Sequence, residues 1–226
     1  MSVVVPIVGS VDGIGDVRWR TDVELTNDQP GEATVALTLP TAPGQPVIVT
    51  SIAPGDTIRF EDVIAQAFGM ESALSPLIVQ TLGRRSVSIR AVAYGVRGTD
   101  TFKLEPIDVS YGDTYFPLRA LPGLSFNDDF RTNIGLSNLS ERDAVFILAL
   151  QRVAGRSLAI TRITLPPSSM VQSSIQLLFP LITSGDGFRV VVECGEPSSG
   201  VYASVIANAT NEATFISPVI VTELEQ

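Results

Sequence analysis

The fold is decided by the stretch Trp19-Arg-Thr-Asp-Val-Glu-Leu-Thr-Asn27, which returns later in the chain as Phe130-Arg-Thr-Asn-Ile-Gly-Leu-Ser-Asn138. In the first copy of this stretch, every second residue is apolar or a threonine, and the residues between are charged or polar. This period of two is typical of a β-strand with one buried face. Trp19 shares the face of Val23 and Leu25, so we expect it in the core, where Phe130 would replace it in the second copy.

The match extends outward from this stretch in both directions. The same ungapped alignment runs from Val3 to Leu39 and pairs Pro6 with Pro117 and Leu37 with Leu148. Further along, the alignment shifts slightly and again runs without gaps, so that Leu77-Ile-Val-Gln-Thr falls on Val190-Val-Val-Glu-Cys and Ile89 on Tyr202. Identity is low, but apolar positions keep their place. The pattern therefore predicts an internal duplication.

Each copy reads as a series of short strands separated by glycine and proline turns. In the first copy the expected strands are Thr34–Leu39, Val47–Ile52, Leu77–Thr81, Val87–Tyr94 and Phe102–Val109. A short helix is expected within Phe60–Gly69 and another within Ser173–Ile182, where Pro180 should end it early. The predicted fold is all-β: two tandem immunoglobulin-like β-sandwiches, residues 1–110 and 111–226, each with one short helix.

Four features together resemble a known kind of β-sandwich unit: Trp19–Asn27, Pro54-Gly-Asp-Thr57, the Asp62-Val-Ile…Phe68-Gly69 helix and Tyr202–Glu212. The similar units occur in secreted, largely uncharacterised bacterial proteins, often in tandem. The resemblance covers nearly the whole chain and its motifs are structural. It implies export and an architectural role outside the cell or at its surface, and it carries no catalytic residues.

Composition narrows the expected partners and location. Hydrophobic residues make up 45% of the chain and charged residues 17%, with a net charge of −9. An acidic surface repels phosphate, so nucleic acid is not expected as a partner. No apolar stretch approaches the roughly 20 residues that span a bilayer, so membrane insertion is not expected. Met1–Ser10 lacks the basic region and cleavage site of a signal peptide, so either the protein stays inside the cell or a leader has been removed.

The absence of histidine argues against catalysis. The chain contains none, which excludes the Ser-His-Asp and Cys-His systems and the usual zinc ligands. Cys194 is the only cysteine, and it lies in an apolar stretch that indicates a buried strand. We therefore expect no enzyme and no cofactor.

Arginines are the first candidates for an interaction site. Arg20 and Arg131 occupy the same place in the two copies, where each could offer a bidentate fork to a carboxylate, phosphate or sugar. The favoured alternative is that each pairs within its own copy, because a fold-determining position repeats with the fold. Arg84, Arg85 and Arg97 lie where the copies differ, and specific binding is more readily expected there.

Two loops carry candidates for calcium, the only metal that the sequence suggests. Asp12 and Asp16 flank a glycine-rich loop, and Asp128 and Asp129 lie at the comparable place in the second copy. Their spacing fits no EF-hand, and aspartate and glycine are also ordinary turn residues. The loops therefore predict turns more strongly than a metal site.

The predicted function is structural: a non-catalytic protein that presents a surface or adheres, and that could assemble with copies of itself through edge strands. The apolar ends, Ser2–Val8 and Phe215–Thr222, would invite such pairing if either formed an outer strand, and Pro6 and Pro218 would then protect the edge. The alternative is a carbohydrate-binding module of a secreted bacterial protein, built on the available tryptophan and tyrosines.

Overall fold

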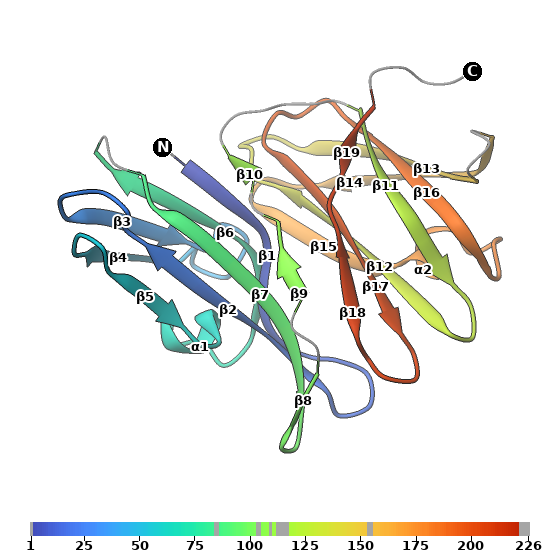
Figure 1. Ribbon diagram of the computed structural model, residues 1–226. Helices are drawn as coiled ribbons and strands as arrows, with labels where there is room; N and C mark the ends of the chain where they lie inside the picture. The colour runs from blue at the N-terminus through green and yellow to red at the C-terminus, as the bar shows by residue number, and fades with distance from the viewer. Residues whose placement is uncertain are drawn as a thin grey trace. The chain divides into compact units, whose positions relative to one another are not determined.

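The computed structural model describes residues 2–83, 86–102, 105–108, 110–111, 118–152 and 156–221 of the chain. It contains two compact units, Met1–Gly112 and Asp113–Gln226, here called unit 1 and unit 2. The described part of each unit consists of β-strands and one short helix (Figure 1). The all-β prediction, with one short helix in each half, is therefore confirmed.

Unit 1 is a sheet folded over on itself. Its strands are β1 (Ser2–Asp12), β2 (Arg18–Thr26), β3 (Ala33–Thr38), β4 (Val47–Ile52), β5 (Thr57–Phe60), β6 (Ala73–Leu82), β7 (Ser88–Arg97), β8 (Asp100–Thr101), β9 (Glu105–Ile107) and β10 (Ser110–Tyr111). One half runs β4-β3-β6-β1 with β10 on β1, and the other is β5-β2-β7 with β8 and β9 on β7. The strand β1 joins them, because its last two residues pair with β2. Buried side chains from both halves form the core.

Unit 2 is a sandwich of two separate sheets. Its strands are β11 (Leu118–Phe126), β12 (Phe130–Asn138), β13 (Ala144–Arg152), β14 (Ser157–Leu165), β15 (Ser169–Ser174), β16 (Gly185–Cys194), β17 (Ser199–Ala207), β18 (Ala213–Ile216) and β19 (Val219–Ile220). One sheet has the order β14-β13-β16-β11-β19 and the other β15-β12-β17-β18. Phe126 and Phe188 stack in the core at 5.1 Å between ring centroids, and Cys194 is buried in the same cluster.

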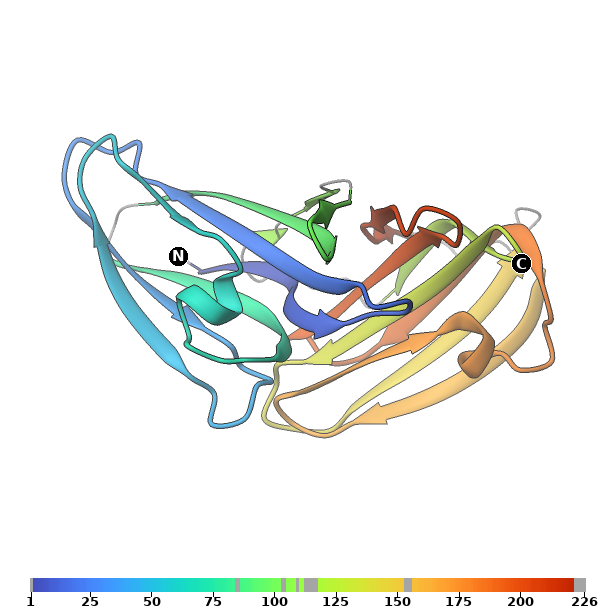
Figure 2. The ribbon, with the colours of Figure 1, turned by 90° about the horizontal axis from the view of Figure 1, so that it is seen from below.

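Both helices are single turns. The helix α1 (Val63–Gln66) begins where the Asp62 side chain accepts a hydrogen bond from the amide of Ala65, and it packs against β1 and β2 (Figure 2). The helix α2 (Ile175–Leu178) begins at Ser174 in the same manner and ends just before Phe179 and Pro180. Each of the two segments predicted to contain a short helix therefore contains one.

The alternation predicted for β2 holds over most of the strand. Thr21, Val23 and Leu25 are buried, whereas Trp19 is only half-buried. The indole lies over the β1–β2 hairpin, where a Cβ added to Gly13 would meet its Nε1 at 2.6 Å. In β12, Phe130 is 38% exposed. The prediction that Trp19 and Phe130 lie in the core is therefore wrong. Both residues lie at the start of their strands, next to the preceding hairpin.

Strand register allows the two units to be compared position by position. Leu37 pairs with Val79 in unit 1 and Leu148 with Val192 in unit 2, so these four strands keep the alignment read from the sequence. However, Leu25 pairs with Ile89, whereas Leu136 pairs with Val201. Ile89 therefore corresponds to Val201 and not to Tyr202, a correction of one residue.

The first strand requires a larger correction. In unit 1 the pairing with β6 shifts between Val5 and Val8, and in unit 2 the pairing with β16 shifts between Leu121 and Leu124. These matching β-bulges align Pro6 with Pro122. The predicted partner, Pro117, lies outside the described residues. The ungapped alignment fails here because the hairpin that follows the strand is shorter in unit 2.

An asparagine closes one end of unit 1. Asn27 follows β2 directly and is completely buried. Its Oδ1 accepts a hydrogen bond from the amide of Gln29 at 3.0 Å. Its Nδ2 donates to three backbone carbonyls, those of Gly31, Ile52 and Ala53. One side chain thus holds the β2–β3 turn against the end of β4.

An asparagine makes the same contacts in unit 2. Asn138 is the last residue of β12 and is also completely buried. Its Oδ1 accepts from the amide of Ser140 at 3.0 Å. Its Nδ2 donates to the carbonyls of Arg142, Leu165 and Pro166. The hydrogen-bond donors and acceptors occupy corresponding positions in the two units.

Candidate functional site

The two repeated arginines contact partners within their own units. Arg20 Nε lies 3.5 Å from Asp62 Oδ2 in unit 1. Arg131 donates to Oδ1 of Asn208 at 3.0 Å and to Oδ1 of Asn211 at 2.8 Å in unit 2. Partial burial lowers the pKa of Arg131. Each guanidinium thus helps to hold a strand end and its neighbouring loop.

Of the remaining predicted arginines, Arg97 lies in the described part of the chain and contacts an aromatic ring. Arg97 lies at the end of β7, and its guanidinium carbon is 5.1 Å from the centroid of the Phe102 ring. This is the distance range of a cation–π contact. Arg84 and Arg85 lie outside the described residues.

The calcium candidates belong to two turns. Asp12 Oδ1 is 3.2 Å from Arg18 Nη1. In unit 2, Asn127 Oδ1 accepts hydrogen bonds from the amides of Asp129 and Phe130 and so closes the turn, while the carbonyl of Asp128 accepts one from Asn208. Among the residues described, no three acidic, histidine or cysteine side chains are placed to hold a metal ion. Asp12, Asp16, Asp128 and Asp129 therefore do not belong to a group of three such side chains.

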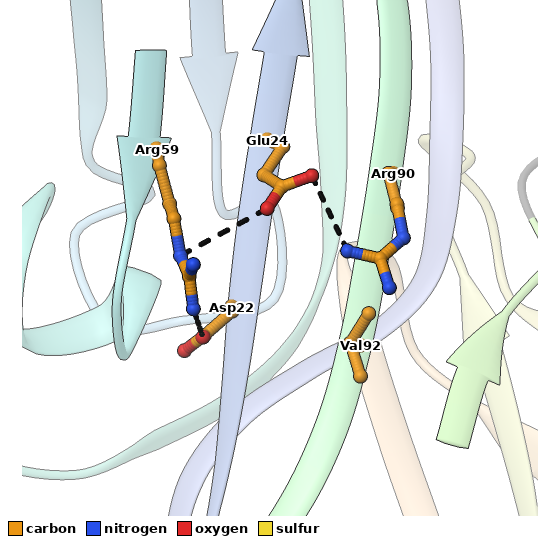
Figure 3. Close-up of a pocket in the computed structure, with 5 residues that line it drawn as sticks. All are labelled: Asp22, Glu24, Arg59, Arg90 and Val92. Atoms are coloured by element: carbon orange, nitrogen blue, oxygen red, sulfur yellow. Dashed lines mark hydrogen bonds and ion pairs between the residues drawn. The ribbon is translucent and has the colours of Figure 1, made fainter. Parts of the chain in front are cut away.

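The densest group of charges lies on the outer face of the β5-β2-β7 half of unit 1. Register places Glu24 of β2 opposite Arg59 of β5 on one side and opposite Arg90 of β7 on the other. With Asp22 and Val92 these residues line a small surface pocket (Figure 3). The name ion-pair ladder is used here for Asp22, Glu24, Arg59 and Arg90.

Charges of opposite sign alternate across the ion-pair ladder. Arg59 Nη2 is 2.9 Å from Asp22 Oδ2, and Arg59 Nε is 3.9 Å from Glu24 Oε1. Arg90 Nη1 is 3.3 Å from Glu24 Oε2, an ion pair marked by a dashed line in Figure 3. The side chains of the two arginines are 53% and 62% exposed. Water and salt screen pairs as exposed as these, so they tie neighbouring strands together only weakly.

The ion-pair ladder continues into a more buried group at Asp62. The Asp62 amide donates to Asp22 Oδ1 at 2.9 Å, and Asp62 Oδ2 accepts from Ser10 Oγ at 3.0 Å. Tyr94 lies beside these acids, opposite Arg20. Burial, followed by the charge and the hydrogen bond of Asp22, raises the pKa of Tyr94 to about 12. Its hydroxyl is therefore neutral at physiological pH.

The corresponding face of unit 2 has no such ladder among its described residues. Gly135 takes the place of Glu24, and it pairs with Tyr202 on one side and Gln172 on the other. The tyrosine ring lies directly over the glycine and stacks on Phe215 at 5.5 Å between centroids. Its hydroxyl donates to Gln172 Oε1 at 2.7 Å. Tyr202 is buried, so its ring is not available to stack on a sugar.

The outward-pointing side chains of the β4-β3-β6-β1 half of unit 1 are uncharged, in contrast to the ion-pair ladder on the other half. Alternation along the strands points one set of side chains outward, and cross-strand pairing arranges this set in three rows. We call this set the uncharged face. The first row is Ser51, Thr34 and Leu82; the second is Val49, Ala36, Gln80 and Ser2; and the third is Val47, Thr38, Ile78 and Val4. Val47, Val49 and Leu82 are 56%, 62% and 51% exposed.

Among the strands that end a sheet, β4 and β14 lie next to exposed apolar side chains. In unit 1 the edge strand is β4, which carries Val47 and Val49. In unit 2 it is β14, where Leu158 is 40% exposed and Ile160 is 66% exposed. Unpaired backbone groups beside apolar side chains are a common route to strand pairing between molecules.

The two ends of the chain differ in their access to an edge. The N-terminal strand β1 lies between β6 and β10, so it is not an outer strand, and Pro6 sits at its β-bulge. Near the other end, β18 and β19 each close one side of a sheet, with Pro218 between them. An outer strand is therefore found at the C-terminal end and not at the N-terminal one.

Sequence reasoning missed both the ion-pair ladder and the uncharged face. The outward positions of β2 were visible in the alternation, but their partners Arg59 and Arg90 follow only from the strand order. For the uncharged face, the signal was the lack of charge at every second position of Val47–Ser51 and Ile78–Leu82.

No protein-family model matches the chain, and no curated protein or solved structure matches it either. No helix in the described part of the chain is long and apolar enough to cross a membrane.

Proposed function

We propose that the two units are immunoglobulin-like sandwiches that arose by duplication of one ancestral unit. Support comes from the shared register of Leu37 with Val79 and of Leu148 with Val192. The matching contacts of Asn27 and Asn138 are further support, because each involves a turn and a distant strand end. Independent sequences would not be expected to place one buried amide against corresponding backbone carbonyls.

The function proposed for this scaffold is structural: a non-catalytic protein that presents a surface and associates with copies of itself through edge strands. The observation that carries the proposal is the open edge of β4 and of β14, each beside exposed apolar side chains. The contacts of Arg20, Arg59, Arg90 and Arg131 within their own units are consistent with this role. Location outside the cell or at its surface is proposed on the resemblance to units of secreted proteins.

Edge pairing can be tested without altering either outer face. Thr50 in β4 and Thr161 in β14 are half-buried and point inward at the two edges. An inward-pointing lysine on an edge strand blocks pairing with a second strand, because pairing would bury its charge. Thr50→Lys and Thr161→Lys should each shift the protein toward monomer in size-exclusion chromatography with light scattering, and together they should shift it further.

The matched control is Thr99→Lys, in the exposed β7–β8 turn, which should leave the size distribution unchanged. Thermal unfolding followed by circular dichroism shows whether each variant is folded. If the wild-type protein is monomeric at every concentration, self-association is excluded. Binding of the protein to a glycan array, together with a monomeric state, would instead support the carbohydrate-binding alternative.

A further inference from the structure

The strands β4 and β14 take the same place in the two units. Each ends the strand order that leads to the first strand of its unit, β4-β3-β6-β1 in unit 1 and β14-β13-β16-β11 in unit 2. Each also pairs with a strand whose register the units share, since Leu37 of β3 corresponds to Leu148 of β13. The edges of β4 and β14 are therefore corresponding edges, and their surroundings can be compared directly.

The surroundings of these two edges differ in charge. The stretch Leu25–Ile58 includes β4 and contains three acidic residues and no lysine or arginine. The corresponding stretch Leu136–Val171, bounded by the same strand pairing, includes β14 and contains four arginines and two acidic residues. The acidic residues of the first stretch and the arginines of the second are all exposed: Asp28, Glu32 and Asp56; Arg142, Arg152, Arg156 and Arg162. One edge thus lies in an acidic region and the other in a basic region.

Three of these charged residues lie directly beside the edge strands. Arg162 points outward from β14, and Arg156 immediately precedes the strand. Asp56 lies in the turn that follows β4, where its amide donates to the carbonyl of Ala53 at 3.1 Å. Pairing of the two edges would therefore bring opposite charges together.

We propose that β4 of one copy of this chain pairs with β14 of a second copy, antiparallel, so that two sheets continue into one. The proposal rests on the self-association through edge strands proposed above, and it names the two edges that meet. In the register that sets Val49 opposite Ile160, the exposed apolar side chains of both strands lie on one face. The same register sets Arg156 opposite Ala53, close to Asp56.

Charge favours this pairing over the pairing of like edges. The net charge of −9 opposes contact between copies in general, so an attraction between copies has to be local. Pairing β14 with β14 would bring the arginines of two copies near one another, and like charges on paired strands destabilise a sheet. Pairing β4 with β4 would join two acidic regions. Of the three combinations, β4 with β14 alone joins an acidic region to a basic one.

Pairing between two different edges has a consequence for assembly size. A copy that uses its β4 still has its β14 available, so a third copy can add in the same way. Head-to-tail contacts of this kind form open chains or closed rings. For the wild-type protein we therefore expect species larger than a dimer as the concentration rises.

Mixing two edge variants tests the proposal. Thr50→Lys blocks β4 and leaves β14 intact, whereas Thr161→Lys blocks β14 and leaves β4 intact. Each variant alone should shift to monomer in size-exclusion chromatography with light scattering. An equimolar mixture should form a dimer, because each copy supplies the edge that the other lacks, and it should stop at two copies because both remaining edges carry a lysine.

The matched control is a mixture of Thr50→Lys with the double variant Thr50→Lys/Thr161→Lys. This mixture contains no intact β4, so it should stay monomeric. Thermal unfolding followed by circular dichroism shows whether each variant is folded.

Exchange of one charge pair tests the contact at the end of β4. Arg156→Glu and Asp56→Arg should each weaken association about three- to ten-fold, as expected when an exposed ion pair becomes a pair of like charges. Asp56→Arg also reduces the net negative charge of the chain, so general repulsion between copies would predict the opposite effect. The combined variant restores opposite charges in every interface and should associate like the wild type.

The outcomes separate this proposal from the proposed function. If each lysine variant still forms a dimer alone and the double variant does not, like edges pair, so the β4–β14 proposal is overturned while edge association stands. A variant mixture that stays monomeric, or a combined charge variant that associates no better than Arg156→Glu, also overturns the β4–β14 proposal. A wild-type protein that is monomeric at every concentration overturns both proposals, as does a double lysine variant that associates like the wild type.

Discussion

At the scale of single residues, the buried asparagines matter most for stability. Asn27 and Asn138 each replace several hydrogen bonds to water with hydrogen bonds to backbone groups of two separate segments. Buried polar groups of this kind contribute modestly while satisfied and cost much more when a partner is removed. Both residues end the matching stretches Trp19–Asn27 and Phe130–Asn138, yet the sequence could not indicate that they were more than turn residues.

Replacing Asn138 by aspartate should therefore be strongly destabilising. The carboxylate would face three carbonyl oxygens in place of the amide that donates to them. An uncompensated buried charge typically costs about 3–5 kcal/mol, and urea unfolding should show a loss of that order. The control is Asn133→Asp on the same strand, where the side chain is half-buried. Equal unfolding midpoints for the two variants would contradict the stabilising role of Asn138.

The candidate arginines Arg20 and Arg131 have partners that are distant in the sequence. The preference for a partner within the same copy agrees with the contacts of Arg20 and Arg131, but the partners themselves were not foreseen. Asp62 and Asn208 lie far along the chain, and they reach these arginines only through the folding of whole strands. Local sequence patterns carry no information about such distant contacts.

At the scale of strands and helices, periodicity was a good guide where a strand lies flat on the core. The predicted strand Val47–Ile52 coincides with β4, and Thr34–Leu39 differs from β3 by one residue at each end. Prediction failed where a strand bends. The β-bulge of β1 at Pro6 changes which residues face inward, and a bulge leaves no periodic signature in a short stretch.

The pairing of β2 with β7 has a consequence for pH dependence. The pKa of Tyr94 is raised to about 12 in the folded state, from an ordinary value of 10.0. As the pH rises above 10, the unfolded chain loses this proton before the folded chain does, so the free energy of unfolding should fall between pH 10 and 12. Replacing Tyr94 by phenylalanine should make this fall shallower in urea unfolding at several pH values. Ultraviolet titration of the same variant should lack one tyrosine that ionises near pH 12, and an unchanged titration curve would contradict the assignment.

At the scale of the whole molecule, the pattern of short strands and turns predicted the all-β fold class but not the surface. A 45% hydrophobic chain with short strands forms sheets that cover one another. Which outer face is charged depends on the strand order, because Arg59, Glu24 and Arg90 come from three separate strands. Strand order follows from the complete fold and not from any one segment.

The stability of the whole molecule should not depend on calcium. The aspartates of both candidate loops take part in turns or pair with arginine, and the described residues supply no cluster of ligands. Thermal unfolding in EDTA and in millimolar calcium should therefore give the same melting temperature. A rise with calcium that is absent with magnesium would require a specific site.

The shared register of the two units bears on how such a chain can change over generations. Burial constrains the inner side of every sheet, so a substitution there alters strand alignment or stability. The outer sides differ between the units, since Glu24 in one unit corresponds to Gly135 in the other while the strand pairing is kept. A lineage that carries this scaffold can thus exchange the chemistry of one surface while it keeps the other, and the two halves of a single polypeptide become free to specialise.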